Sequence, residues 1–391
     1  MPIPKRIKNI CLLPAAVGLL LTETPCRAQI DPVDRNLIEL GYDQFLAARG
    51  PQAIYAYYYF NRPDFIGPDV ALRVAVAPAY LDSEMGFKHL LSPYTDVGVG
   101  VSGGAFGDNY YEVRQGSYLE NQSFYGSGGG ASLSIYQLLD PGRLIPLNLV
   151  ARAGFRYSAF ADTPETSRVF ALPGSQDDGY TRVGVRFGGQ QPTLYPALGM
   201  ELSAWFERQQ HFSSGTYGFD NDRGVTPYTD LYWFRASLDY KLKESGDMYS
   251  FAATVGGSTD ADRLSAWRLG GDLPLVSEFP LVLPGYYYEE LTVVRFAHFY
   301  ASYSVPLDQA RRWELRFEAA TARLAYLPGF EQQGDWQTGA GFGIGYTPRR
   351  KNLTIILRYG YGLNAIRHDK DGAQSVGLLF QYDFNTRKKR R

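Results

Sequence analysis

The sequence predicts an all-β protein, a transmembrane antiparallel β-barrel of about 14 strands, or 16 if one hairpin is missed. Apolar and polar residues alternate in segment after segment, which places one kind of side chain on each face of a strand. The connections between these segments alternate between short and long, as they do in bacterial barrels. After the N-terminal segment, no run of about 18 apolar residues is present that would cross a membrane as a helix. Aromatic residues make up 15% of the 391 residues, which suits aromatic girdles at two membrane interfaces.

The first 28 residues are interpreted as a signal peptide. A basic start around Lys5 is followed by an apolar run at 10–21 and by small residues before Gln29, where we expect cleavage. Lipidation of Cys26 is the less favoured alternative, because the three residues before it are not small and apolar. Both cysteines of the chain, Cys11 and Cys26, lie in this segment. The mature chain is therefore expected to have neither a disulfide nor a cysteine metal site.

Three further segments complete the expected organisation. Residues 29–50 are interpreted as a periplasmic lead-in or small plug, because they are fewer than the roughly 40 residues that a separate folded module needs. The barrel is expected over residues 51–384. The basic residues 385–391 are expected to form a solvated periplasmic tail, with binding to anionic lipid or peptidoglycan as the alternative.

The alternating segments define the expected strands. They are residues 53–61, 69–82, 95–106, 124–138, 146–160, 178–190, 196–209, 228–242, 248–258, 290–306, 313–326, 334–347, 352–364 and 374–384. If the first strand runs outward, the long connections 107–123, 161–177, 210–227 and 259–289 are all extracellular, and the short ones are periplasmic. The expected turn at 83–94 is longer than this rule favours.

Charged residues recur on the face of each strand opposite an aliphatic and aromatic face. A charge on the lipid face costs about 2–4 kcal/mol at the membrane midplane, so we expect these charges in the lumen. They form either a salt-bridged network that closes the barrel or an arginine-rich pore wall that favours anions. The residues expected to line the lumen are Arg152, Arg156, Arg182, Arg186, Arg235, Asp239, Glu314, Arg316, Glu318 and Arg358.

The last strand resembles the C-terminal signal by which bacterial outer-membrane barrels are recognised for assembly. It carries the pattern polar–x–Gly–x–x–aromatic–x–aromatic at the end of the expected barrel. One face of this strand is apolar and aromatic, and the other is small or polar, with Leu379 as the exception. This resemblance implies the outer membrane of a Gram-negative-type bacterium as the location. Its partners are then the lipid bilayer with its lipopolysaccharide, and the barrel assembly machinery during insertion. The expected signal residues are Ser375, Gly377, Phe380, Tyr382 and Phe384.

The long connection 259–289 carries the segments Trp-Arg-Leu-Gly-Gly-Asp at 267–272 and Leu-Pro-Gly-Tyr at 283–286, and five predicted strands follow it. The antepenultimate strand has glycine at every second position from Gly339 to Gly345. Together these features of residues 252–384 resemble the C-terminal barrel half of the bacterial surface antigen superfamily. That superfamily includes BamA-type assembly factors, two-partner secretion transporters and the barrels that follow patatin-type lipases.

The resemblance implies that this long loop folds back into the lumen and that its tip contacts the inner wall. Pro284 stands where the family carries an arginine at the tip. The row of glycines either leaves room for something packed in the lumen or permits strand bending. The residues expected in the inward loop are Arg268, Gly270, Gly271, Asp272, Gly285 and Tyr286.

Three functions are compatible with these patterns. The resemblance favours a structural or transport-related barrel with an inward loop and, for protein substrates, a separate periplasmic partner. The alternative is a diffusion porin or small-solute channel with a mixed-charge lumen. A lipid hydrolase is a distant third, because His298 and Ser302 at positions i and i+4 of a strand are about 13 Å apart, so no enzyme is expected. No cofactor or metal motif is present, and the formal net charge of −1 argues against nucleic acid as a partner.

Overall fold

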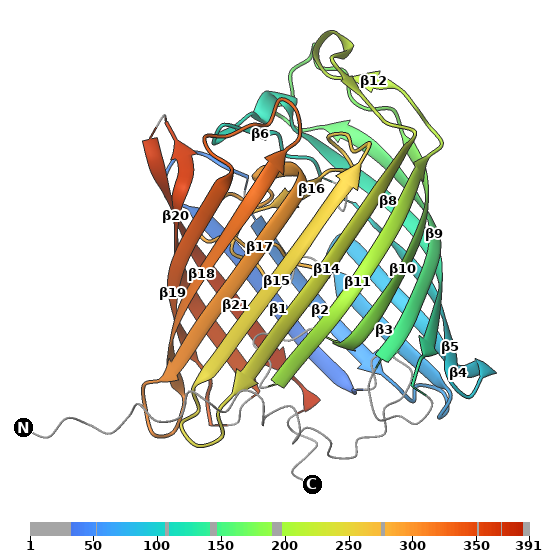
Figure 1. Cartoon of the computed structure of the whole chain (residues 1–391), viewed down its shortest axis with the longest axis vertical. Coiled ribbons are helices and arrows are strands. Elements are labelled where there is room, and N and C mark those ends of the chain that lie inside the picture. Colours follow the sequence, from blue (N-terminus) through green and yellow to red (C-terminus); the bar gives the residue numbers. More distant parts are fainter. Residues whose placement is uncertain are drawn as a thin grey trace, which may run out of the picture.

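The structure, a computed structural model, is a closed antiparallel β-barrel (Figure 1). It describes residues 33–385 except 52, 106–108, 141–146, 190–197, 275–277, 350–351 and 369. The signal peptide expected at 1–28, most of the tail at 385–391 and the start of the lead-in therefore lie outside the described residues. Among the described residues, no helix has the length and apolar character needed to cross a membrane.

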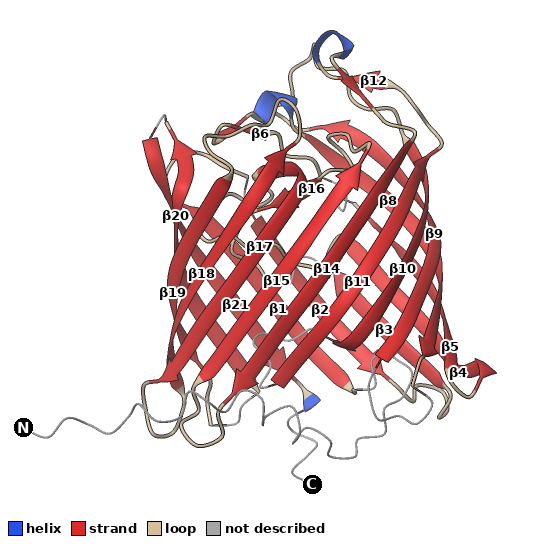
Figure 2. Cartoon of the chain, in the orientation of Figure 1, coloured by secondary structure: helices blue, strands red, loops and turns tan. Residues whose placement is uncertain are grey.

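Sixteen long strands form the wall, and nearly all of the described chain outside the loops is strand (Figure 2). They are β1 (Arg35–Phe45), β2 (Ala53–Arg62), β3 (Val70–Ala77), β4 (Tyr80–Ser92), β5 (Thr95–Gly104), β8 (Phe124–Leu138), β9 (Leu147–Asp162), β10 (Gln176–Gly189), β11 (Leu198–His211), β14 (Tyr228–Lys241), β15 (Met248–Thr259), β17 (Leu291–Pro306), β18 (Trp313–Tyr326), β19 (Trp336–Tyr346), β20 (Leu353–Arg367) and β21 (Lys370–Asp383). Each pairs with its neighbours in chain order, and β1 pairs with β21 to close the ring.

Shorter elements lie in the long connections. They are β6 (Val113–Arg114), β7 (Ser117–Tyr118), η2 (Glu120–Gln122), β12 (Thr216–Tyr217), η3 (Phe219–Asn221), β13 (Arg223–Gly224) and β16 (Trp267–Leu269). We call the end of the barrel that carries these connections the loop end. The opposite end, where β1 begins and β21 ends, is the turn end. Figure 1 shows the loop end at the top.

The predicted antiparallel barrel is confirmed, and its strand number is the alternative of 16 in place of about 14, because two strands were missed. The first is β1, which lies within the segment 29–50 interpreted as a lead-in or plug. Its residues pair with β2 on one side and β21 on the other, so this segment belongs to the barrel wall. The lead-in interpretation is wrong for residues 35–45. The reason is local: apolar residues at 37, 38, 40, 42 and 45 have near-helical spacing, and the lumen face carries Glu39, Gly41 and Asp43.

The second missed strand is β4, most of which falls in the expected turn at 83–94. Only Pro78 and Ala79 join β3 to β4, and neither is a residue that marks a two-residue hairpin. The predicted strand 69–82 therefore merged β3 with the start of β4. Because β1 and β4 were both omitted, the two errors cancel. From β5 onward the expected alternation of short turns and long loops agrees with the structure, whereas the strand expected first, 53–61, runs in the direction opposite to the expected one.

The two faces of the wall are inverted relative to a water-soluble protein. Large apolar side chains are exposed on the outside, and charged side chains are buried on the inside. On β18, for example, Phe317 is exposed whereas its neighbours Arg316 and Glu318 are buried. An apolar exterior around a polar interior is the arrangement that a lipid bilayer requires.

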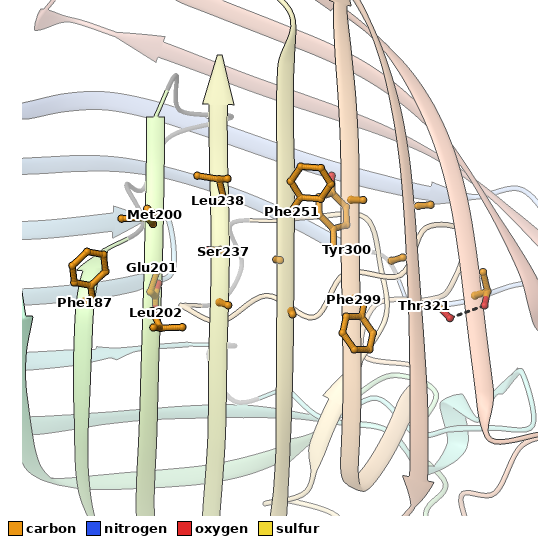
Figure 3. Close-up of a pocket in the computed structure, with 17 residues that line it drawn as sticks. Phe187, Met200, Glu201, Leu202, Ser237, Leu238, Phe251, Phe299, Tyr300 and Thr321 are labelled. Atoms are coloured by element: carbon orange, nitrogen blue, oxygen red, sulfur yellow. Dashed lines mark hydrogen bonds between the residues drawn. The ribbon is translucent and has the colours of Figure 1, made fainter. Parts of the chain in front are cut away.

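The exterior also carries an apolar groove of about 790 Å³ across β10 to β19 (Figure 3). Its lining includes small side chains such as Ala236, Ala301 and Ala319, and the rings of Phe251 and Phe299. The hydroxyl groups of Thr321 and Thr338 in this groove bond to each other at 2.9 Å. Such a lining suits lipid acyl chains and places the groove outside the lumen.

Candidate functional site in the barrel lumen

The connection 260–290 between β15 and β17 folds into the lumen over its described residues; we call it the inward loop. The first part of the loop contains the short strand β16, which pairs antiparallel with the start of β17. Its two arms are joined by a bridge between Gly271 and Leu283. Loop residues Leu269, Leu281, Leu283 and Tyr286 then bury themselves against wall residues such as Phe296. The loop that the sequence predicts at 259–289 is therefore an inward loop in the structure.

Asp272 anchors the loop at the seam where β1, β20 and β21 meet. Its backbone N–H donates to Oδ2 of Asp43 at 2.8 Å, and its side chain accepts a hydrogen bond from the hydroxyl of Ser375. Its backbone carbonyl accepts from Arg358, whose Nε also donates to Glu318 at 2.9 Å. Burial raises the pKa of Asp272 to about 6, although nearby Arg358 opposes this effect. The anchor therefore joins two expected sets of residues, the inward loop and the lumen wall.

The tip of the loop fits against glycines of the wall. Gly285 has a φ of +83°, and a Cβ on it would lie 2.0 Å from the backbone nitrogen of Gly362. A Cβ on Gly339 would lie 2.2 Å from the carbonyl oxygen of Pro284, so this glycine leaves room for the tip. The hydroxyl of Tyr286, next to the tip, donates to Gln337 at 2.9 Å. Of the glycine row, Gly339 packs against the loop.

A buried ion pair clamps the base of the loop. Arg367 at the end of β20 donates through both terminal nitrogens to Glu290, at 2.9 and 2.7 Å. Glu290 also accepts from the backbone N–H of Tyr287 at 2.8 Å, and the Arg367 guanidinium lies 3.5 Å from the centre of the Tyr287 ring. Glu290, Tyr287 and Arg367 are all buried.

On the far side of the lumen the loop reaches the wall formed by β10, β11 and β14. Oε2 of Glu278 lies 3.1 Å from Nη1 of Arg182, and its Oε1 lies 4.0 Å from Nη1 of Arg186. The ring of the next residue, Phe279, packs against Trp205 and Trp233. The loop therefore contacts opposite walls of the barrel.

The other long connections cover the loop end above the inward loop. Arg223 forms a buried ion pair with Glu112 at 3.4 Å and lies over the ring of Phe170. Tyr110 of the same cover lies under the guanidinium of Arg268, 4.1 Å from ring centre to Cζ. Connections 109–123, 163–175 and 212–227 thus form a cap over the lumen.

The structure places all ten expected lumen residues on the inner face of their strands. Several form ion pairs there: Arg152 with Glu84, Arg156 with Asp178, Arg182 with Glu207, Arg186 and Arg235 with Glu201, and Arg358 with Glu318. Arg316 donates to Ser302 instead, and Asp239 and Glu314 lie nearer the turn end. The inner wall therefore combines the expected arginines with carboxylates in a connected network.

Sequence reasoning missed the partners that matter most to the loop. Asp43 was missed because its strand was not recognised. Glu278, Glu290 and Arg367 were not singled out, because an ion pair between a loop and a distant strand has no local signal. His298, the strand histidine, lies inside the barrel, and its Nε2 bonds the carbonyl of Val282 in the loop at 2.8 Å.

The closing strand β21 divides its expected signal residues between two faces. Ser375 and Gly377 lie on the inner face, and Ser375 holds Asp272. Phe380 and Tyr382 lie on the outer face, and Phe384 follows the strand with its ring 4.9 Å from that of Tyr382. Leu379, the apolar exception on the inner face, packs against Leu273 of the inward loop.

Comparison with known proteins identifies the fold. Neither a protein-family model nor a curated protein matches the sequence. Among solved structures, CdiB from Acinetobacter baumannii is similar with a TM-score of 0.56 and 11% identity, over 90% of this chain and 60% of that one. CdiB from Escherichia coli gives 0.54 and 13%, over 90% and 63%. BamA from Haemophilus ducreyi lacking POTRA domains 1–3 gives 0.52 and 11%, over 89% and 71%.

This chain thus spans about three-fifths of the length of the two CdiB chains. At such low identity the likeness shows the fold alone. The resemblance to the surface antigen superfamily is therefore confirmed for the architecture of the barrel. The neighbours are membrane barrels whose fold suits a Gram-negative outer membrane.

Proposed function

We propose that this chain is an outer-membrane transport barrel whose lumen is gated by the inward loop. The observation that carries the proposal is the loop's attachment to opposite walls of the barrel. Asp272 is bonded at the β1–β21 seam, and Glu278 is paired with Arg182 of β10. The loop is thus attached to two walls that face each other across the lumen.

The chemistry of the attachment favours a gate over a permanent plug. The loop is attached to the two walls by hydrogen bonds and ion pairs. The polar groups that form them can bind water when the loop leaves the wall. Glu278 is half-exposed, with 47% of its side chain accessible, so its contact with Arg182 is the weaker end. The buried ion pair of Glu290 and Arg367 is the stronger contact, and it too would have to break for the gate to open. Both contacts would then hold the loop in the closed state.

Insertion into the membrane fits the same proposal. The outer face of β21 presents its aromatic residues to lipid, and we propose that the barrel assembly machinery recognises this strand. A separate periplasmic partner would be required if the transported molecule is a polypeptide.

Planar-bilayer conductance tests the proposal. The wild-type protein is expected to show brief, infrequent openings, and deletion of residues 265–286 is expected to give long, ohmic ones. Deletion of residues 244–245, which are exposed in the turn between β14 and β15 at the turn end, is the control and should leave the wild-type trace unchanged. A wild-type channel that is already open, and that the first deletion does not alter, would contradict the gate.

A diffusion channel for small solutes is the second candidate. It is favoured by one feature of the wall, where Arg152, Arg182 and Arg186 lie on the adjacent strands β9 and β10. Rings and rows of charged side chains set the ion selectivity of a pore. An open, anion-selective wild-type channel in the same experiment would support this function.

A further inference from the structure

Glu278 and Phe279 of the inward loop occupy two adjoining sites on the wall. The carboxylate of Glu278 lies between Arg182 and Arg186. The ring of Phe279 lies 5.7 Å from that of Trp205 and 5.2 Å from that of Trp233, measured between ring centres. One negative charge and one aromatic ring, adjacent in the chain, thus meet two guanidinium groups and two indole rings.

Contacts within the wall position most of these groups, and Trp233 also packs against Trp267 of β16, with ring centres 5.4 Å apart. Arg182 and Arg186 lie two residues either side of Gly184 on β10, and a Cβ on Gly184 would lie 2.3 Å from the ring of Trp205. The glycine therefore lets the indole lie close to the backbone between the arginines. Trp205 and Trp233 are directly opposite each other on β11 and β14, and their rings stack at 5.9 Å.

Carboxylates of the wall hold both arginines in place. Nε of Arg182 donates to Glu207 at 2.5 Å, and Arg186 lies 3.7 Å from Glu201. The guanidinium of Arg182 also lies over the ring of Trp233, 5.4 Å from its centre. These contacts do not involve the loop, so the arginines would keep their places if Glu278 moved away.

The electrostatic field at this position favours a further anion. Enclosure in the barrel by itself would raise the pKa of Glu278, but the surrounding arginines outweigh this effect and lower the pKa below its ordinary value. The indole N–H groups of Trp205 and Trp233 are buried, and neither has a hydrogen-bond partner among the described residues. The wall thus offers positive charge, two unused donors and aromatic surface together.

We infer that this wall is a binding site for a solute that carries a carboxylate close to an aromatic ring, and that Glu278 and Phe279 occupy it in the solute's place. The inference rests on the proposed function, in which the inward loop leaves the wall. A carboxylate takes charge-assisted hydrogen bonds from guanidinium groups, and a ring gains edge-to-face contacts with indole rings. A solute that binds here competes with the loop and so stabilises the open state.

Cinnamate is a suitable probe, and its binding to the whole purified barrel in detergent can be measured by calorimetry. The double variant Glu278→Ala, Phe279→Ala frees the site and is expected to bind cinnamate at least about tenfold more tightly than the wild type, because the loop no longer competes. Cinnamyl alcohol, which lacks the charge, and hexanoate, which lacks the ring, are both expected to bind more weakly than cinnamate.

Substitutions in the double variant locate the site. Arg182→Gln or Arg186→Gln is expected to weaken cinnamate binding by about tenfold or more, since each removes a charged hydrogen-bond donor. Arg208→Gln is the matched control, because Arg208 lies on the outer face and pairs with Asp230. Heat-modifiable gel mobility verifies that each variant is folded, and Arg186→Lys should restore part of the affinity.

Equal binding of cinnamate and cinnamyl alcohol, or unchanged binding in both arginine variants, would overturn the inference. So would the absence of cinnamate binding to the folded double variant. The proposed gate is judged separately, from conductance without cinnamate. A double variant that opens the channel but binds no cinnamate leaves the gate intact and refutes the site.

Discussion

Replacing Arg367 by methionine should release the base of the inward loop. Arg367 is the only cation that the structure shows within bonding distance of Glu290 among the described residues, and both side chains are almost completely buried. Methionine retains much of the volume of the arginine side chain but has no donor. In the Arg367→Met variant, the Glu290 carboxylate would keep only the N–H of Tyr287.

The expected cost is large. Removing one partner of a buried ion pair destabilises a protein by about 3–5 kcal/mol, because the other charge is left without compensation. When the loop swings out, Glu290 regains water, so most of this cost falls on the closed state. Each 1.4 kcal/mol is about a factor of ten, so the closed-to-open ratio should fall by roughly 10²–10³.

Single-channel recording of the open probability measures this shift. Arg323→Met is the matched control: Arg323 pairs with Asp335 at 3.2 Å, but both side chains are more than half exposed. Exposed pairs contribute about 0–1 kcal/mol, so the control should change the open probability by less than about fivefold. If the two variants behave alike, the buried pair does not hold the loop and the reasoning fails.

Three further predictions concern the loop and the seam. In wild type, the stabilisation from protonating Asp272 is complete below its solvated pKa near 4 and is lost as the pH rises through the docked value of about 6. Acidification from pH 7 to 5 should therefore favour closure, and Asp272→Asn should abolish that part of the pH dependence of open probability. Gly285→Ala should expel the tip and raise conductance, whereas Gly329→Ala, at a similar φ of +88° in open surroundings, should not. Cysteines at Tyr42 and Leu378, which are directly opposite on the outer faces of β1 and β21, should crosslink in the folded protein; no crosslink would contradict the seam.

Much of the wall was predictable because alternation is a local signal. A strand with a lipid face and a lumen face shows period two within about ten residues, so Phe317 and Glu318 reveal their faces without any knowledge of the fold. Strand β1 escaped recognition because its inner face mixes Leu37 with Glu39 and Gly41, so no clean alternation is present. One of its two partner strands, β21, lies more than three hundred residues away, where no local pattern records the pairing.

The inward loop was predictable in position but not in its contacts. Its length and its glycines mark it, and the resemblance implied that it folds inward. The contact between Arg182 and Glu278 joins residues 96 positions apart, and that between Asp43 and Asp272 joins residues 229 apart. Such pairs depend on barrel diameter and strand register, which a single sequence does not specify residue by residue. Because residue 284 is a proline, the polar contacts of the loop near its tip come from Asp272 and Tyr286.

The seam between β1 and β21 also sets an order of events during folding. Until the last strand arrives, β1 has an unpaired edge, and edges of this kind invite pairing with other chains. The two strands are separated by nearly the whole chain, so their pairing carries the largest loop-closure entropy of any contact in the wall. Asp43 and Ser375, on the two sides of this seam, both hold Asp272. The complete set of partners for Asp272 therefore exists only once the ring of strands has closed. Docking of the inward loop is then expected to follow closure of the barrel.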